Sequence, residues 1–203
     1  ELERSLSEKV VLLKEVHHRV KNNLQVVSSL LSLRANGIDD PLARSSFQES
    51  RAQIESMALI HERLYETQDL ARIDCAEYVR ALAANVFDSY GADPQRLRLE
   101  VSVEPHVVTV DTAIHCGLIV HELVSNSIKY AFPASRTGTV RVQASPVHDR
   151  LAKLVVDDDG IGLPSGLHPA QAGTLGLRLV GDLARQMQGT IAIERDPGTT
   201  FTI

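Results

Sequence analysis

The stretch that decides the fold of this chain reads Val155-Val156-Asp157-Asp158-Asp159-Gly160-Ile161-Gly162. Its apolar, β-branched start is typical of a buried strand, and the strand ends in three carboxylates followed by two glycines spaced one residue apart. Glycine lacks a Cβ and reaches positive φ at little cost, so the turn is suited to lie close to a ligand. The pattern predicts a strand that delivers an acidic side chain to the floor of a binding site.

Composition excludes several classes of protein. The 203 residues, 43% of them hydrophobic, are enough for one or two small domains with real cores. A net charge of −5 and the absence of tryptophan argue against a nucleic-acid binder. Cys75 and Cys116 lack a metal-type spacing, which favours reduced thiols in a cytoplasmic protein. The chain begins in a helical pattern and stops in a strand pattern, so we interpret it as a piece of a longer protein.

The first third of the chain carries helical periodicity. Residues 36–41 predict a turn, because a glycine is suited to end one helix and a proline to open the next. On both sides of this turn apolar side chains recur at steps of three and four, namely at Val10, Leu13, Val16, Val20, Leu24, Val27 and Leu30, and at Ala43, Phe47, Ile54, Met57 and Leu64. We expect an antiparallel helical hairpin over residues 1–68 and a second domain over residues 69–203. Two helices alone cannot cover both stripes, so the hairpin is expected to form a homodimeric four-helix bundle, unless other parts of the protein cover the seam.

From residue 73 the pattern is mixed. Helices are expected over residues 74–90, 111–130 and 176–188, and strands over 97–103, 140–144, 151–156, 189–194 and 199–203. Residues 163–174 are rich in glycine, proline and small side chains, which predicts a loop. Helices and strands alternate without βαβ regularity, which favours an α+β layered sandwich.

The expected helix 111–130 carries a polar face. Glu122, Asn126 and Lys129 lie at positions i, i+4 and i+7. A carboxylate, a carboxamide and an ammonium group on one face suit a hydrated Mg²⁺ that carries phosphates. For this helix taken alone, a solvated polar stripe is an equally good interpretation.

Two further glycine segments complete the pattern. Glycines in the segment 173–176, after the expected loop, open a helix, and a helix N-terminus is suited to bind an anion. Gly198-Thr199 adds a turn with a hydroxyl group. No P-loop occurs, and the acidic glycine turn does not precede a Rossmann helix, so neither a P-loop enzyme nor a dinucleotide fold is favoured.

The order and spacing of these motifs over residues 74–203 resemble the ATP-binding domain shared by histidine kinases, gyrase-type topoisomerases and heat-shock chaperones, a Bergerat-type α/β sandwich. The resemblance implies ATP and Mg²⁺ as cofactors. The residues that it assigns to them are Asp158 for the adenine amino group, Gly160 and Gly162 for the adenine pocket, Thr199 for its far side, Asn126 and Glu122 for Mg²⁺, Lys129 for phosphate, and Gly173, Leu175 and Gly176 with residues 163–174 for the lid over ATP.

The segment Glu15-Val16-His17-His18-Arg19-Val20-Lys21-Asn22-Asn23-Leu24 resembles the phosphoacceptor box of sensor histidine kinases of the His-Arg-x-x-Asn subclass, HWE-related and of HisKA type 2, with His18 as acceptor. Helical geometry agrees, since His18 shares a face with polar residues while His17 points toward the apolar stripe. Glu15 and Asn22, one turn before and after His18, are rival candidates to orient its imidazole. The Trp-x-Glu of the HWE group is absent, because the chain has no tryptophan.

The resemblance implies an ATP-dependent histidine autokinase of a two-component system. It would transfer the γ-phosphoryl group of ATP to His18, with Glu122 assisting, and then to an aspartate on the receiver domain of a response regulator, under the control of an N-terminal sensor domain. Two alternatives stay open. One is a phosphotransfer scaffold with a degenerate ATP domain, against which the intact Asn126 and Asp158 argue. The other is an ATPase in which Glu122 activates water, against which the His18 box argues.

Overall fold

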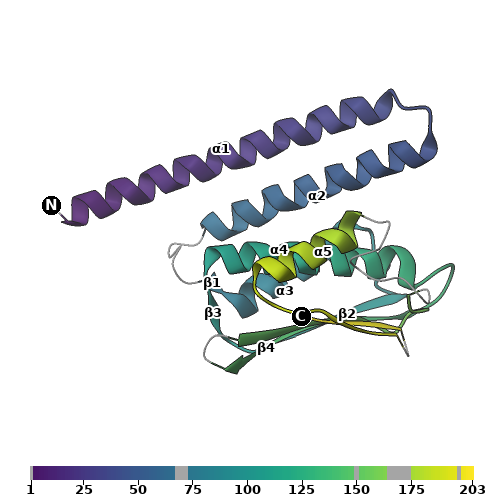
Figure 1. Cartoon of the computed structure of the whole chain (residues 1–203). Coiled ribbons are helices and arrows are strands. Elements are labelled where there is room, and N and C mark those ends of the chain that lie inside the picture. Colours follow the sequence, from purple (N-terminus) through teal and green to yellow (C-terminus); the bar gives the residue numbers. More distant parts are fainter. Residues whose placement is uncertain (1, 67–72, 149–150, 164–174, 196–197) are drawn as a thin grey trace. The chain divides into compact units, whose positions relative to one another are not determined.

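A computed structural model of the chain describes residues 2–66, 73–148, 151–163, 175–195 and 198–203. The chain divides into two compact units, Glu1–Leu70 and Ala71–Ile203, which are described separately (Figure 1). Most of the expected lid, residues 164–174, lies outside the described residues.

The first unit is an antiparallel pair of helices, α1 (Leu2–Asn36) and α2 (Pro41–Glu66) (Figure 1). The turn falls where the sequence predicts it. The Gly37 amide donates to the Arg34 carbonyl at 3.1 Å and closes α1. The Arg44 guanidinium donates to the Ile38 carbonyl at 2.7 and 3.0 Å and ties the loop to the start of α2. The predicted helical hairpin is therefore confirmed.

Small side chains form the contact between α1 and α2. Ser28, Ala35 and Ala58 are buried, and the Ser28 hydroxyl donates to the Glu55 carboxylate at 2.9 Å. Small residues let two helix backbones approach closely, which leaves larger side chains on other faces. Several apolar residues of α1 are accordingly exposed, namely Val16, Val26, Val27, Leu30 and Leu33. Part of the apolar stripe, including Val16, Val27 and Leu30, is thus left uncovered by α2, as expected if two helices alone cannot cover both stripes.

The second unit is an α/β sandwich. Its helices are α3 (Cys75–Ser89), α4 (Val110–Asn126) and α5 (Leu175–Gln186), and a π-helical turn, η1 (Ser127–Ala131), continues α4. Its strands are β1 (Ile73–Asp74), β2 (Leu97–Val103), β3 (Val107–Val108), β4 (Gly138–His148), β5 (Leu151–Asp158), β6 (Ala192–Glu194) and β7 (Thr199–Thr202). The Asp74 carboxylate caps α3 by accepting from the amides of Ala76 and Glu77, as its position in the sequence indicates.

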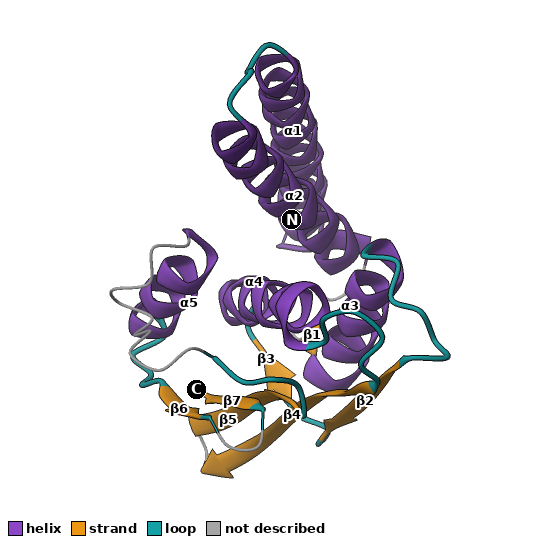
Figure 2. Ribbon diagram, turned by 90° about the vertical axis from the view of Figure 1, so that its right-hand side faces the viewer, coloured by secondary structure: helices purple, strands orange, loops and turns teal. Residues whose placement is uncertain are grey.

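Five strands form one sheet in the order β2-β4-β5-β7-β6, and α3, α4 and α5 cover one face of it (Figure 2). All neighbours pair antiparallel except β2 and β4, which run parallel because the chain crosses over through α4. The largest fully buried side chains lie between sheet and helices and include Leu82, Ile119, Leu123, Val140, Val142, Val156 and Val180. The predicted α+β sandwich is confirmed. The short β1–β3 pair and the parallel β2–β4 pair were not predicted.

Candidate functional site

Asp158 is the last residue of β5 and lies beneath the helices. Alternate residues of a strand share a face, and Leu154 and Val156 point into the core, so Asp158 follows them inward and is only 5% exposed. One carboxylate oxygen accepts the Gly160 amide at 3.0 Å, and the other accepts the Ser127 hydroxyl at 2.9 Å. The strand therefore delivers a buried, oriented carboxylate, as the sequence predicts.

Two opposing effects act on this carboxyl group. Burial is the larger and raises the pKa of Asp158 above its usual value, and the neighbouring charge of Asp157 adds to this. Hydrogen bonds from the Ser127 hydroxyl and from the amides of Gly160 and Thr199 favour the ionised form and oppose the rise in pKa. The result is an acceptor in apolar surroundings that retains capacity for one more donor.

The glycine turn after β5 lies close to the end of α4. The Ile161 amide donates to the Ala131 carbonyl at 3.0 Å, and a Cβ on Gly160 would collide with the same Ala131. Gly162 has a φ of +76°, a conformation that side-chain-bearing residues rarely adopt. Both glycines are thus required for the turn to pass beneath the π-helical turn η1.

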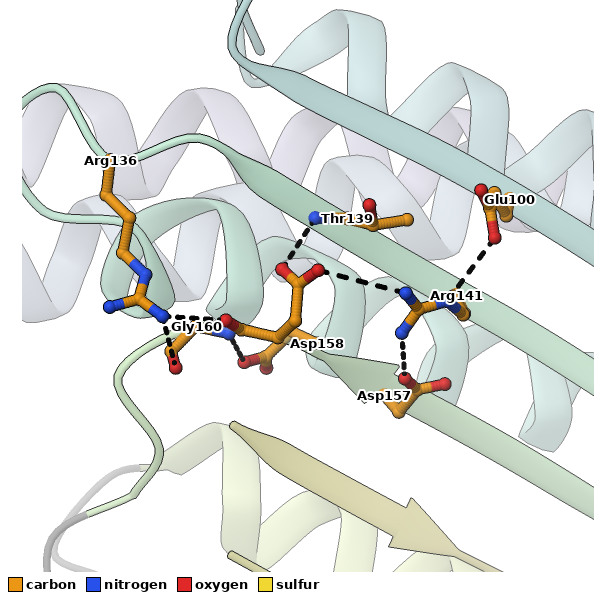
Figure 3. A network of polar contacts seen from close by, with 8 residues as sticks. Glu100, Arg136, Thr139, Arg141, Asp157, Asp158 and Gly160 are labelled. Atoms are coloured by element: carbon orange, nitrogen blue, oxygen red, sulfur yellow. Dashed lines mark hydrogen bonds and ion pairs between the residues drawn. The ribbon is translucent and has the colours of Figure 1, made fainter. Parts of the chain in front are cut away.

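Arg136 clamps this turn from outside. Its guanidinium donates to the carbonyl oxygens of Asp159 at 2.9 Å and Gly160 at 3.1 Å (Figure 3). The Asp159 carboxylate accepts the Thr139 amide at 2.7 Å and so joins the turn to the start of β4. Asp159 therefore has a structural role in holding the turn that follows Asp158.

Arg141 explains why three consecutive aspartates are tolerated. It contacts Asp157 at 2.8 Å, Glu100 at 3.3 Å and Asp159 at 3.8 Å (Figure 3). The hydrogen bond to Asp157 is the first cause that raises the pKa of Arg141 above its usual value. Arg141 neutralises the two outer carboxylates, so only Asp158 of the three is left to face the site.

Glu122 and Asn126 come from the last two turns of α4. Glu122 is buried, and its carboxylate lies 3.8 Å from His121 Nδ1. A methyl group at Gly176, the second residue of α5, would collide with the Glu122 carboxylate and lie 3.9 Å from Asn126 Nδ2. The structure thus brings together Glu122, Asn126 and Gly176, which the sequence assigns to Mg²⁺ and to the lid.

Lys129 lies on η1, where the helix geometry changes. The sequence predicts a continuous α-helix to residue 130, and this is wrong because Ser127–Ala131 is π-helical, which alters the register after Asn126. The Lys129 ammonium lies 4.8 Å from the centroid of the Tyr90 ring, within cation–π range. The Tyr90 ring in turn lies 5.8 Å from that of His121.

The donors on α4 fit Mg²⁺. A hard divalent ion takes oxygen ligands, keeps several waters and is usually held by one or two protein groups together with substrate phosphates. The Glu122 carboxylate and the Asn126 amide oxygen supply two such groups. Within the described ranges no group of three His, Cys, Asp or Glu side chains could hold a metal.

The structure describes only some of the remaining predicted site residues. Thr199 is buried on β7, directly opposite Asp158 in the β5–β7 register. Leu175 opens α5, but its side chain is not described, and Gly173 lies outside the described residues.

The phosphoacceptor box lies in the middle of α1. The backbones of His17 and His18 are helical, but their side chains lie outside what the structure describes. Glu15 forms an ion pair with Arg19 at 2.9 Å. The other described residues of the predicted polar face are exposed, namely Asn22, Gln25 and Ser29.

Sequence reasoning missed Ser127, Arg136 and Arg141. Ser127 follows Asn126 directly, but only the packing of η1 onto β5 shows that its hydroxyl meets Asp158. In the sequence, Arg136 and Arg141 look like ordinary surface charges. A long-range ion pair such as that between Arg141 and Glu100 leaves no signal in a single sequence.

If Asp158 binds the adenine base, as the resemblance implies, Ser127→Ala should make nucleotide binding more sensitive to acid. The change removes a hydrogen bond that lowers the pKa of Asp158, so the pKa rises further and the carboxylate is protonated at a higher pH. Adenosine affinity, measured calorimetrically in EDTA across the acidic range, should therefore begin to fall at a higher pH than in the wild type. Ser127→Thr keeps a hydroxyl and should restore the profile. Ser125→Ala is a matched control, because Ser125 bonds the Glu122 carbonyl instead. Identical profiles for Ser127→Ala and wild type would contradict the role of Ser127.

Two family models match the chain. Residues 15–90 match the family described as Histidine kinase. Residues 111–203 match the family described as Histidine kinase-, DNA gyrase B-, and HSP90-like ATPase.

Curated relatives and a solved structure agree with these matches. Sensor histidine kinase PdtaS of Mycobacterium tuberculosis is 32% identical over 205 residues, which cover 99% of this chain and 40% of that protein. Blue-light-activated histidine kinase 2 of Erythrobacter litoralis is 29% identical over 204 residues, which cover 94% and 55% of the two chains. The histidine kinase domain from the Erythrobacter litoralis EL346 blue-light activated histidine kinase superposes with a TM-score of 0.70 at 21% identity, covering 96% of this chain and 92% of that one, which supports the fold.

A buried aspartate and glycine turn beneath a helix that carries Glu122 and Asn126, in a sandwich of this topology, define an ATP-binding catalytic domain. The preceding helical hairpin narrows the class, and the chain belongs to the histidine kinases. It spans about 40–55% of the length of the curated relatives that it matches. Among the described helices, none combines the length and apolar character needed to cross a membrane.

Proposed function

We propose that this chain catalyses transfer of the γ-phosphoryl group of ATP to His18 and then to an aspartate on the receiver domain of a response regulator. The observation that carries the proposal is the buried Asp158 carboxylate, held by Ser127 and Gly160, in a chain that also carries the His-Arg-x-x-Asn box. In the first step the bond between the γ-phosphorus and the β–γ bridging oxygen breaks, a nitrogen–phosphorus bond forms on His18, and ADP and the imidazole proton leave.

The residues of the site have distinct tasks in this reaction. Asp158 accepts from the adenine amino group and fixes the base. Asn126 and Glu122 would hold Mg²⁺, which when bound neutralises the phosphate oxygens as charge is transferred. Lys129, at the exposed edge of η1, would meet the phosphates, and this requires it to leave the Tyr90 ring. Phosphoryl transfer depends mainly on positioning and charge neutralisation, which these groups supply.

The direct test is incubation of the chain with γ-labelled ATP and Mg²⁺, followed by acid and alkali. A phosphohistidine is a phosphoramidate, so label should survive alkali and be lost in acid. Label that survives acid would indicate a serine or threonine acceptor and overturn the proposal. Binding without any labelling would favour the scaffold, and release of phosphate without labelled protein would favour an ATPase with Glu122 as the group that activates water.

Asn126→Ala should impair self-labelling much more than adenine binding. Mg²⁺ held by Asn126 would act on the phosphates and not on the base, so adenosine affinity in EDTA should be retained while Mg²⁺-dependent labelling falls by about 10²-fold or more, as for loss of a group that stabilises transferring charge. Gln143→Ala removes an exposed amide on β4 and serves as the control. If adenosine without metal loses as much affinity as ATP with metal, the assignment of Asn126 to the metal is wrong.

Glu15 and Asn22 are the two candidates to orient the His18 imidazole. The ion pair with Arg19 already engages one Glu15 oxygen, whereas Asn22 is exposed. We therefore favour Asn22 as the orienting group and Glu15 as the group that accepts the proton.

The exposed apolar side chains of α1 support a homodimer through the hairpin. Val26, Leu30 and Leu33 are 59%, 56% and 70% exposed in the single chain, and contiguous apolar surface marks an interaction site. Leu30→Glu should convert a dimer to a monomer in light scattering, since burial of a leucine contributes about 1.5–3 kcal/mol and symmetry counts it twice. Gln25→Glu, on the polar face, is the matched control. A monomeric mass for the wild type at micromolar concentration would show that another part of the full-length protein covers this face.

The remaining partners follow from the same proposal. The relatives are longer proteins named as sensor or light-activated kinases, which supports an N-terminal sensor domain beyond this chain. Two free cysteines and a need for ATP support a cytoplasmic location for the domain.

A further inference from the structure

A cavity of about 730 Å³ lies within the ATP-binding unit. It is bounded by the first turns of α4, by the residues that follow α5 and by the ends of β4 and β5 near Ala144 and Leu154. None of the described residues that line it belongs to the nucleotide site around Asp158. Its volume is within the range of small-molecule sites, which is about 300–1,000 Å³.

The floor of this cavity is apolar and rich in sulfur. Val79 and Leu154 are buried, and Cys75, Cys116 and Met187 add three sulfur atoms. The Cys116 Sγ lies 4.0 Å from the Met187 Sδ. Divalent sulfur is polarizable and packs favourably against aromatic rings, so the floor suits a planar ring.

The thiols of the floor are uncharged at neutral pH. Burial raises the pKa of Cys75 to about 11 and that of Cys116 to about 12. A metal ion needs deprotonated thiolates, and among the described residues no group of three His, Cys, Asp or Glu could hold one. A neutral organic ring therefore fits this floor better than an ion does.

Polar side chains line the rest of the cavity. The less buried lining residues include three imidazoles and an ammonium against one carboxylate, namely His106, His115, His148, Lys153 and Asp111. This surplus of donors favours an anionic oxygen group.

We propose that this cavity binds a small aromatic acid, with its ring against the sulfur floor and its acidic group toward the histidines. The site is distinct from the nucleotide site, although α4 contributes to both, with Cys116 at the cavity and Glu122 at the nucleotide.

The test uses the full chain and the fluorescent probe 8-anilinonaphthalene-1-sulfonate, an aromatic acid. The probe should bind saturably, and Ala144→Phe, which fills the cavity, should weaken binding by at least about tenfold. Ala84→Phe, at an exposed position of α3, is the matched control and should bind as the wild type does. All variants share the exposed apolar face of α1, to which the probe can also bind. A difference in probe affinity between the variants therefore reflects binding in the cavity. Thr112→Trp narrows the cavity from α4 without entering the core and replaces Ala144→Phe if that variant fails to fold.

A second readout locates the probe directly. The chain has only two cysteines, so alkylation by N-ethylmaleimide can be assigned to each thiol by mass. Saturating probe should slow alkylation of Cys116 at alkaline pH, and saturating ADP should not displace the probe. Equal affinity for the wild type and both filling variants, displacement by ADP, or unchanged alkylation of Cys116 would each overturn the proposal.

Discussion

Asp158→Asn should abolish measurable ATP binding while leaving the protein folded. The carboxylate accepts from Ser127 and Gly160 and is left with capacity for the adenine amino group. An asparagine has one acceptor oxygen, which the Gly160 amide would occupy, and its NH₂ group would oppose the adenine amino group. Loss of a hydrogen bond to a charged acceptor costs about 1.5–3 kcal/mol, which is about 10- to 150-fold in affinity, and the opposed donors add to this.

The neighbouring aspartate gives a matched control. Asp157→Asn makes the same chemical change one residue earlier, where the carboxylate contacts Arg141 on the sheet rather than the site. Calorimetry with ADP in EDTA should show binding for Asp157→Asn and none for Asp158→Asn. Equal affinities in the two variants would remove Asp158 from the adenine site.

Asp158→Asn should also change the free energy of unfolding, and the direction of this change can be stated. A carboxyl group whose pKa is raised in the folded state binds its proton more tightly when folded. Its contribution to the free energy of unfolding is therefore complete below its unfolded pKa and is lost as the pH rises through the folded pKa. At neutral pH the ionised Asp158 destabilises the fold, so Asp158→Asn should melt at the wild-type temperature or above. This advantage should shrink toward acidic pH.

Local signals in the sequence were sufficient for most of the fold. Periodicity, the Asp74 cap and the turn at residues 36–41 are local, so the helices and strands fall close to where the pattern puts them. Strand pairing is a long-range property, and the parallel β2–β4 contact and the short β1–β3 pair have no local signal.

The site was predictable where a motif fixes a backbone shape. The strand and glycine turn placed Asp158, and helical spacing placed Glu122 and Asn126 side by side. Spacing failed at Lys129, because it assumes α-helical geometry and η1 departs from it. It also could not distinguish three adjacent aspartates, since their roles depend on Arg141 and Ser127, which reach them from other elements.

In the hairpin, too, the sequence pattern could not predict which residues meet. Apolar spacing identifies the faces of α1 but not which face meets α2. Ser28 and Ala35 are buried, whereas Val26, Leu30 and Leu33 are exposed and available to a second chain.

The largest functional effect should come from His18→Ala, which is expected to abolish self-labelling from γ-labelled ATP with little change in melting temperature. Successive helical residues point about 100° apart, so helical spacing predicts that His18 shares a face with Asn22 and Gln25, which are exposed. Removing an exposed side chain away from special features changes stability by about 0.5 kcal/mol or less.

His17→Ala should do the reverse. Helical spacing predicts that His17 shares a face with Val20 and Leu24, which are half-buried, so its removal should lower the melting temperature while some labelling remains. His17→Leu should restore packing and keep activity, which makes it the matched control for a change at the adjacent position. Labelling that survives His18→Ala but is lost in His17→Leu would mean that the acceptor is the other imidazole. In that case the phosphoacceptor would lie one residue earlier in the box, at His17. The polar face around Asn22 would then serve some other function of α1.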